Sequence, residues 1–341
     1  MSKKNSNVQN LKKLLSKNKK IFQIYSGFKK NIIKSRKKTF IVGVSGGADS
    51  LALAAFSKLY QEEKKAKVFY VLIDHNIRKN SGKEAVKIKK FLKNYKISLN
   101  ILKNQKKITS NVQGQARSIR YSLLLGYCKK KSADCIMTAH HSDDQIETFL
   151  IRLSRGSGIQ GLSSMKPKTK LNKKTTLLRP LLDQKKKDLE YVAKKLFGKF
   201  FVDPSNKDKK YLRIKIRNLK KSFEKSGIFH DQIIKTIKNL SSSSETLNVY
   251  VKKIFKKNVQ KKKSRILIDF KKISLETSEI QLRILSRAIQ LFSDTYYPPR
   301  AKKVLYIINK FKEKKSKRLT LSKCILERSG NYIIITKEAK K

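Results

Sequence analysis

Six residues at positions 45–50, with the sequence Ser-Gly-Gly-Ala-Asp-Ser, have the composition of a phosphate-binding loop. They follow an apolar, strand-like run at 39–44 and precede a helical pattern at 51–60. A glycine turn between a strand and a helix exposes backbone N–H groups, and the helix dipole adds partial positive charge. We therefore expect the loop to bind the phosphates of a nucleotide through these residues: Ser45, Gly46, Gly47, Ala48, Asp49 and Ser50.

The side chains of this loop indicate which ligand groups it can bind. The hydroxyl groups of Ser45 and Ser50 can donate hydrogen bonds to phosphate, whereas the carboxylate of Asp49 repels phosphate. A carboxylate beside phosphates usually binds a Mg²⁺ ion that lies between them. The alternative is an ordinary strand-to-helix turn in which Asp49 and Ser50 cap the helix.

A second group of reactive side chains follows the apolar run at 133–138. His140, Asp144 and Glu147 are spaced i, i+4 and i+7, which places them on one stripe of a helix. Such a cluster is unusual in a chain with 84 basic and 24 acidic residues, so we interpret it as catalytic or ligand-binding. Helix capping by residues 142–144 explains the aspartates but not Glu147, and a zinc site lacks a third ligand at a suitable spacing.

Arginines and glycines follow this cluster. Arg152 and Arg155 precede or flank a segment with three glycines at 156–161. We expect a flexible loop beside the active face, whose arginines can contact phosphate or a base. A surface linker is the alternative interpretation.

The elements that must position these groups alternate between strand and helix. Apolar runs predict five strands, at 39–44, 68–74, 97–102, 133–138 and 176–178. Helical spacing lies between them, at 82–94, 112–131 and 142–153. This alternation predicts an α/β fold with a Rossmann-like parallel sheet covered on both faces. Ligands of such sheets bind at the carboxyl ends of the strands, where the glycine turn is expected.

The pattern changes towards the C-terminus. Residues 207–262 are very basic and helical in spacing, with a turn expected at the four serines 241–244. Two further helices and a terminal β-hairpin are predicted, in this order: 279–292, 299–314, and strands at 319–327 and 332–336. We divide the chain into a basic disordered arm at 1–20, a nucleotide-binding catalytic domain at 21–215, and a mainly helical, basic, RNA-binding region at 216–341.

Composition limits the partners. The formal net charge of +60 indicates a polyanionic partner, because basic surfaces bind nucleic acid through counterion release. Lysine-rich composition is also expected of a genome rich in A and T, so the charge supports RNA binding without establishing it.

The cysteines and the apolar content indicate the compartment. Cys128, Cys135 and Cys324 form no Cys-x-x-Cys pair, so we expect free thiols in a reducing cytosol. No stretch of about 18 apolar residues occurs, which predicts no membrane span and a cytoplasmic location. The oligomeric state is left open, a homodimer included.

Several segments, taken in order, resemble those of the tRNA(Ile)-lysidine synthetases, a family of PP-loop ATP pyrophosphatases. They are 45–50, 73–78, 111–121, 138–162, 178–182 and 203–206. The most selective of them is His-His-x-Asp-Asp-x-x-Glu-Thr at 140–148. The resemblance covers residues 38–220, and the stretch at 212–217 departs from the family pattern.

The resemblance implies the fold of the adenine nucleotide α-hydrolases and a two-step reaction that uses ATP and Mg²⁺. ATP would adenylate the wobble cytidine of an isoleucine tRNA with a CAU anticodon, releasing pyrophosphate. The amine of free L-lysine would then attack the activated carbon and release AMP. The product is lysidine.

The resemblance also implies roles for individual residues. Residues 45–50 and Arg117 would bind ATP, and Asp49 would be catalytic and hold Mg²⁺. The stripe of His140, Asp144 and Glu147 would bind lysine and take part in catalysis. Four arginines would contact tRNA: Arg152, Arg155, Arg213 and Arg217.

Two other interpretations stay open. A tRNA thiolation enzyme of the same superfamily would need an activated cysteine, yet Cys128 and Cys135 fall in a predicted helix and strand. A non-enzymatic RNA-binding protein would bind tRNA without turning over ATP.

Overall fold

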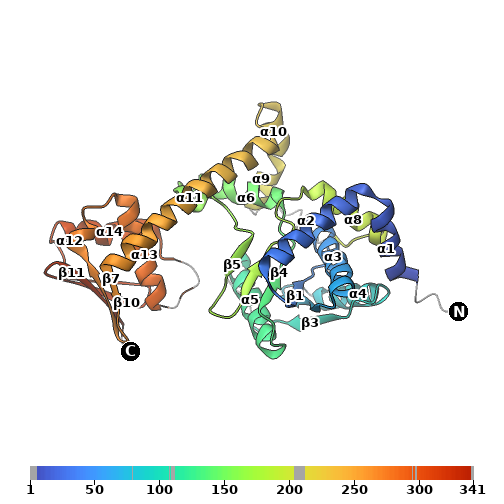
Figure 1. Ribbon diagram of the computed structural model, residues 1–341, viewed down its shortest axis with the longest axis horizontal. Coiled ribbons are helices and arrows are strands. Elements are labelled where there is room, and N and C mark those ends of the chain that lie inside the picture. Colours follow the sequence, from blue (N-terminus) through green and yellow to red (C-terminus); the bar gives the residue numbers. More distant parts are fainter. Residues whose placement is uncertain are drawn as a thin grey trace. The chain divides into compact units, whose positions relative to one another are not determined.

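The computed structural model describes residues 6–78, 80–106, 108, 112–202, 212–293, 295 and 298–338. The chain divides into two compact units, Met1–Lys238 and Asn239–Lys341, each with its own sheet (Figure 1). No helix within the described ranges is both long enough and apolar enough to cross a membrane.

The sheet of the first unit has six strands, of which five are parallel. Their order is β3 (Leu99–Lys103), β2 (Lys67–Asp74), β1 (Thr39–Gly43), β4 (Cys135–Met137), β6 (Thr176–Leu178) and β5 (Lys168–Lys170). Only β5 pairs antiparallel, with β6. The predicted parallel α/β sheet is therefore confirmed. The edge strand β5 was not expected, because two of its three residues are lysines and it carries no apolar signal.

Both faces of this sheet are buried. Phe40 and Val42 of β1 belong to one core, together with α3 (Ala48–Lys64), α4 (Ser81–Lys93) and α8 (Lys186–Phe197). Ile41 belongs to a second core on the opposite face, which α5 (Val112–Lys130) covers. Successive strand residues point to opposite faces, so burial on both sides requires a nearly continuous apolar run. That requirement explains why these strands could be predicted.

The N-terminal segment forms two helices, α1 (Ser6–Lys17) and α2 (Lys19–Ser35). The expectation of a disordered arm at 1–20 is therefore wrong for residues 6–20, and residues 1–5 lie outside the described part. Leu11 is 1% exposed and packs in the first core, and the side chain of Asn18 caps α2 by accepting the N–H of Ile21 at 3.0 Å. The many lysines of this segment led to a prediction of disorder, although the segment forms a helix with one buried side.

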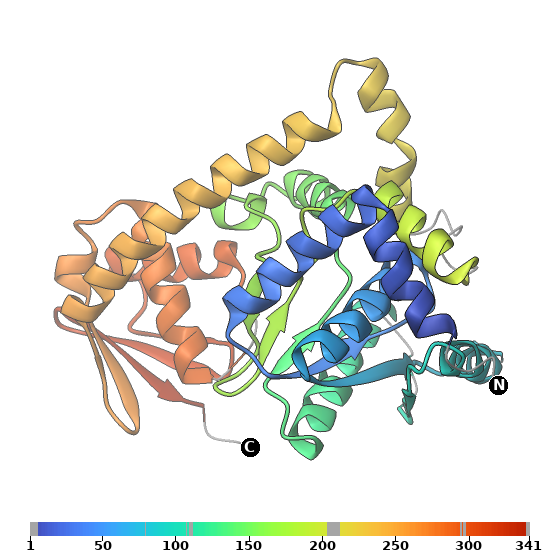
Figure 2. The ribbon, with the colours of Figure 1, turned by 45° about the vertical axis from the view of Figure 1, so that its right-hand side comes forward.

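Five helices complete the first unit and lead out of it. They are α6 (Ser142–Leu153), α7 (Ile159–Leu162), α9 (Leu212–Asn218), α10 (Lys220–Lys225) and α11 (His230–Asn258). The turn expected at 241–244 is wrong, because α11 is one uninterrupted helix (Figure 2). The hydroxyls of Ser243 and Thr246 donate to carbonyls one turn earlier, at 3.2 and 3.3 Å, so these side chains are satisfied within the helix.

The second unit contains an antiparallel sheet of five strands. Their order is β7 (Val259–Lys261), β8 (Arg265–Asp269), β11 (Tyr332–Lys337), β10 (Cys324–Ser329) and β9 (Arg318–Leu321). The short helix α12 (Phe270–Ile273) follows β8, and α13 (Ser278–Ser293) and α14 (Ala301–Lys312) pack with the sheet around one core. The helix pair and the β10–β11 hairpin lie where the sequence predicted them.

Three boundaries differ from expectation in this half of the chain. The strand expected at 319–327 is split by a turn at Ser322 and Lys323, whose φ angles of 54° and 60° interrupt any strand. Residues 259–261, expected to be helical, form β7. The compact units divide after Lys238 instead of after residue 215, because α9 and α10 pack with each other and α9 packs on α6.

Candidate active site

The loop between β1 and α3 has a backbone that requires glycine. Gly46 has a φ of +86°, and a Cβ atom at this position would lie 2.5 Å from Cδ1 of Ile88 in α4. Gly47 is the N-cap of α3 and offers no side-chain cap. Within the described part of the chain, no capping side chain occupies the backbone N–H groups in the first turn of α3, as an anion-binding loop needs.

The two serines of the loop hold its shape. The Ser50 hydroxyl accepts the N–H of Ser45 at 3.1 Å and donates to the carbonyl of Gly47 at 2.9 Å. The Ser45 hydroxyl lies 3.2 Å from that of Ser50, and Ser45 itself is exposed. Ser50 therefore closes the loop from inside, and Ser45, whose hydroxyl donates to that of Ser50, is an exposed residue that a ligand could reach.

A histidine that the sequence analysis did not select joins the two predicted motifs. Nε2 of His141 lies 3.5 Å from a carboxylate oxygen of Asp49 and 3.5 Å from one of Asp144. His141 is 3% exposed and caps α6: the Asp144 N–H donates to its Nδ1 at 3.4 Å, and its own N–H donates to Asp144 at 3.1 Å. The signal in the sequence was a histidine three residues before an aspartate at the start of a helix.

The carboxylates around His141 raise its pKa, whereas protonation of Nδ1 would remove the hydrogen bond that it accepts from the Asp144 N–H. Burial acts to lower the pKa of His141, but the carboxylates around it, Asp49 first among them, outweigh burial and raise it. The other oxygen of Asp49, Oδ1, is buried and has no hydrogen-bond partner among the residues that the structure describes. An unsatisfied carboxylate oxygen beside an anion-binding loop fits a cation held jointly with phosphate.

His140, the preceding residue, has the opposite environment. Its Nδ1 forms a hydrogen bond of 2.8 Å with the Thr138 hydroxyl. Burial is the largest cause that lowers the pKa of His140 well below its ordinary value, and nearby arginines lower it further. These are Arg179, Arg117, Arg213 and Arg120. His140 is consequently neutral at pH 7.

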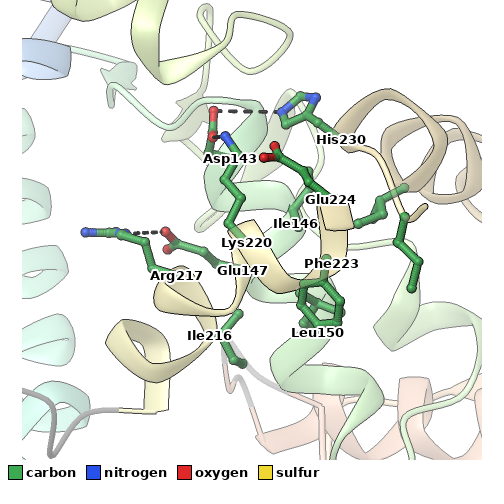
Figure 3. Close-up of a pocket in the computed structure, with 12 residues that line it drawn as sticks. Asp143, Ile146, Glu147, Leu150, Ile216, Arg217, Lys220, Phe223, Glu224 and His230 are labelled. Atoms are coloured by element: carbon green, nitrogen blue, oxygen red, sulfur yellow. Dashed lines mark hydrogen bonds and ion pairs between the residues drawn. The ribbon is translucent and has the colours of Figure 1, made fainter. Parts of the chain in front are cut away.

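Glu147 faces α9 (Figure 3). Its two carboxylate oxygens accept Nε of Arg213 at 2.6 Å and Nε of Arg217 at 2.7 Å, and a second nitrogen of Arg213 lies 3.4 Å from Asp144. Glu147 is 5% exposed. The structure thus joins two predicted lysine-binding carboxylates to two predicted tRNA-binding arginines in one cluster.

A third link ties α6 to the following helices. The carboxylate of Asp143 accepts the backbone N–H of Lys186 at 2.8 Å and Nζ of Lys220 at 3.1 Å. Nε2 of His230, the first residue of α11, lies 3.8 Å from a carboxylate oxygen of Asp143 (Figure 3). The same nitrogen lies 3.1 Å from the Ser142 hydroxyl. Apolar side chains of α6, α9 and α10 pack beneath these polar contacts, Ile146, Ile216 and Phe223 among those that line a pocket there.

Two predicted site arginines differ in their surroundings. Arg152 donates from Nη1 to the carbonyls of Gly161 and Ser164, at 2.6 and 3.1 Å, and so fixes the turn around α7. Arg155 is exposed just after the end of α6.

Arg117, predicted to bind ATP, lies over the ring of Tyr121 at 5.1 Å from its centroid, and its charge is close enough to lower the pKa of His140. The motif at 203–206 lies outside the described residues.

The three thiols are not part of the cluster. Cys128, Cys135 and Cys324 are free and buried. Burial is the main cause that raises the pKa of Cys128 and of Cys135 to about 12. A thiol with such a pKa is not a nucleophile at pH 7. Within the described ranges, no group of three or more His, Cys, Asp or Glu side chains could hold a metal ion by itself.

The sequence matches one family model and several proteins of known name. A family model described as the PP-loop domain matches residues 15–221. A tRNA(Ile)-lysidine synthase of Wolbachia pipientis wMel is 34% identical over 305 residues, which cover 88% of this chain and 70% of that protein. Proteins with the same name from Orientia tsutsugamushi (33% identity, 87% of this chain, 69% of theirs) and Zymomonas mobilis (32%, 73% and 74%) also match.

A solved structure shares the fold. The U34-tRNA thiolase NcsA from Methanococcus maripaludis superposes with a TM-score of 0.54 and 19% sequence identity, over 65% of this chain and 79% of its own. At that identity the likeness extends to the fold alone.

Proposed function

Because this chain belongs to the family of tRNA(Ile)-lysidine synthases, we propose that it uses ATP to join lysine to the wobble cytidine of an isoleucine tRNA that carries a CAU anticodon. It is a ligase that forms a carbon–nitrogen bond. The observation that supports this proposal most strongly is the contact between the glycine loop and α6, where His141 lies 3.5 Å from both Asp49 and Asp144. That contact supports a site in which the glycine loop and the acidic cluster act together.

We propose that the loop at 45–50 binds the phosphates of ATP. Three features support this role: the backbone of Gly46 and Gly47, the start of α3 at a glycine that forms no side-chain cap, and the exposed position of Ser45. Asp49 would hold Mg²⁺, since its Oδ1 is unsatisfied and Mg²⁺ commonly binds through one or two carboxylates plus substrate phosphates. When bound, that ion would offset negative charge on the phosphates.

The acidic cluster would bind lysine. Lysine carries a carboxylate and two amines, so a matching site needs both signs of charge. Arg213 and Arg217 beside Glu147 and Asp144 provide both signs within one cluster. In this proposal the two arginines contact the amino acid rather than tRNA phosphate, which revises their expected role.

The attacking amine must lose its proton. The ordinary pKa of a lysine amine is about 10.4, so only a few molecules in 10,000 are neutral at pH 7. The arginines near His140 would lower the pKa of an amine placed beside them, and neutral His140 could accept the proton. Transfer of AMP to the cytidine oxygen supplies the leaving group that the amine displaces.

The decisive experiment follows a label from lysine into RNA. The chain is incubated with ATP, Mg²⁺, radiolabelled lysine and an isoleucine tRNA with a CAU anticodon, beside a matched tRNA whose wobble cytidine is replaced by uridine. We expect label in the first tRNA only, and only with ATP. Label in neither tRNA, or equal label in both, would overturn the proposal.

A further inference from the structure

The second unit contains an open pocket with a basic lining. Its lining residues come from α12, the last turn of α14, β10 and the β10–β11 turn: Phe270, Lys271, Ser274, Lys312, Arg328 and Asn331. All three charged residues are cations. The nearby carboxylates Asp269 and Glu313 pair instead with Lys272 and Lys315, and among the described residues no carboxylate pairs with Lys271, Lys312 or Arg328.

Arg328 is held in place without a carboxylate. Its guanidinium group lies over the ring of Phe270, 5.5 Å from the centroid, and Nη1 donates to the carbonyl of Phe311 at the end of α14. An arginine fixed in this way loses little side-chain entropy when it binds a ligand, and its other N–H groups remain for that ligand. Chance accumulation of lysine in a basic chain does not account for this arrangement, because it depends on a stacked, hydrogen-bonded arginine.

The backbone fixes the opposite side of the pocket. The N–H groups of Phe270 and Lys271 both donate to the carbonyl of Asn331, at 2.8 and 3.1 Å. Gly330, with a φ of +56°, allows the tight turn that presents Asn331. The start of α12 and the β10–β11 turn therefore form one rigid frame.

We propose that this pocket binds a phosphodiester group of RNA, and the proposal rests on the proposed function in that the RNA is the substrate tRNA. A guanidinium group matches two phosphate oxygens, and the two lysines add charge from the sides. The Ser274 hydroxyl and the Asn331 amide can bond to a ribose hydroxyl or a bridging oxygen. Tyr332 follows Asn331 and is 45% exposed, so a neighbouring base can stack on it, which free phosphate cannot do.

The test compares two double variants that remove the same charge. K271Q/K312Q changes two exposed lysines of the pocket, and K302Q/K303Q changes two exposed lysines on the first turn of α14. RNA affinity is measured by anisotropy with labelled tRNA from about 50 to 300 mM salt. Each lost phosphate contact removes about 0.7 to 0.9 from the slope of log K against log salt. We expect K271Q/K312Q to reduce the slope by up to about 0.7 to 0.9, the contribution of the one phosphate in the pocket, and the control to leave it near that of the wild type.

The outcomes separate this proposal from the proposed function. Equal slopes for the two double variants would overturn the pocket assignment, and lysine transfer to tRNA by the wild type would then still stand. Binding of inorganic phosphate that K271Q/K312Q loses, while its RNA affinity and salt slope stay those of the wild type, would also overturn it by assigning the pocket to a free anion. If the wild type transfers no lysine to tRNA but K271Q/K312Q still has a reduced salt slope, the proposed function is wrong and the RNA contact at the pocket stands. Thermal unfolding of each variant checks that these exposed substitutions leave the unit folded.

Discussion

Replacing Glu147 by Gln should loosen α9 from α6. The carboxylate accepts one hydrogen bond from Arg213 and one from Arg217. A glutamine offers a single acceptor oxygen, and its amide nitrogen would face an arginine donor. We therefore expect E147Q to weaken the cluster that the lysine substrate is proposed to enter, while the glycine loop stays intact.

The contacts set the size of the effect. A hydrogen bond between charged groups contributes about 1.5 to 3 kcal/mol when shielded from water. The side chains of Arg213 and Arg217 are 37% and 35% exposed, so solvent screening reduces each pair to about 1 kcal/mol. We expect the free energy of unfolding to fall by about 2 kcal/mol in E147Q and by about 1 kcal/mol in R217Q.

A double-mutant cycle measured by urea unfolding provides the assay. It uses the wild type, E147Q, R217Q and the double variant, with K215Q as a control on the exposed side of the same helix. We expect a coupling energy of about 1 kcal/mol between Glu147 and Arg217, and no coupling between Glu147 and Lys215. Effects of E147Q and R217Q that add within about 0.3 kcal/mol would refute the reasoning.

The same variant separates the two chemical steps. We expect E147Q to raise the lysine concentration needed for half-maximal labelling of tRNA, while pyrophosphate release at saturating tRNA stays near that of the wild type. An equal loss of both steps would show that Glu147 supports the fold of the site and does not bind lysine.

Three further predictions concern the loop and its histidine. G46A should bind ATP at least tenfold more weakly by calorimetry, because its φ of +86° and the contact with Ile88 exclude a Cβ; near-normal binding would contradict this. D49A should abolish tRNA-dependent ATP–pyrophosphate exchange, and exchange near the wild-type rate would show that the loop is wrongly assigned. H141N keeps a capping group but cannot titrate. The folded-state pKa of His141 is raised, so the wild type should be more stable than H141N below about pH 6.5. This difference in the free energy of unfolding should shrink as the pH rises through the raised pKa. If urea unfolding shows that the difference grows with pH instead, a charged His141 does not stabilise the fold.

The sequence was most informative where local chemistry decides the structure. The glycine at position 46 and the near-continuous apolar run of β1 could be interpreted directly, because backbone freedom and burial on two faces each leave a local pattern. Asp144 and Glu147 were likewise placed on a helix, α6, that the structure contains. The same prediction was wrong for His140, which precedes the N-cap of that helix and therefore shares no helical stripe with them.

The pairing of side chains could not be predicted in the same way. Glu147 and Arg213 are 66 positions apart, and nothing local shows that α9 returns to α6. His141 was missed because the i, i+4, i+7 spacing selected His140 instead, and the helix cap was expected at Ser142, whereas the structure has His141 as the N-cap. Helix α1 was missed because the basic composition of the N-terminal segment was given more weight than the spacing of its few apolar residues, such as Leu11, which is buried.

Because the three cysteines are buried, the reactivity of their thiols reports when each unit of the structure opens. An alkylating reagent reaches thiols only when the surrounding structure separates, so the rate of alkylation measures that event. Cys128 and Cys135 lie in the first unit and Cys324 lies in the second. Mass analysis of the alkylated peptides would time the opening of each unit separately in one sample, without an engineered probe.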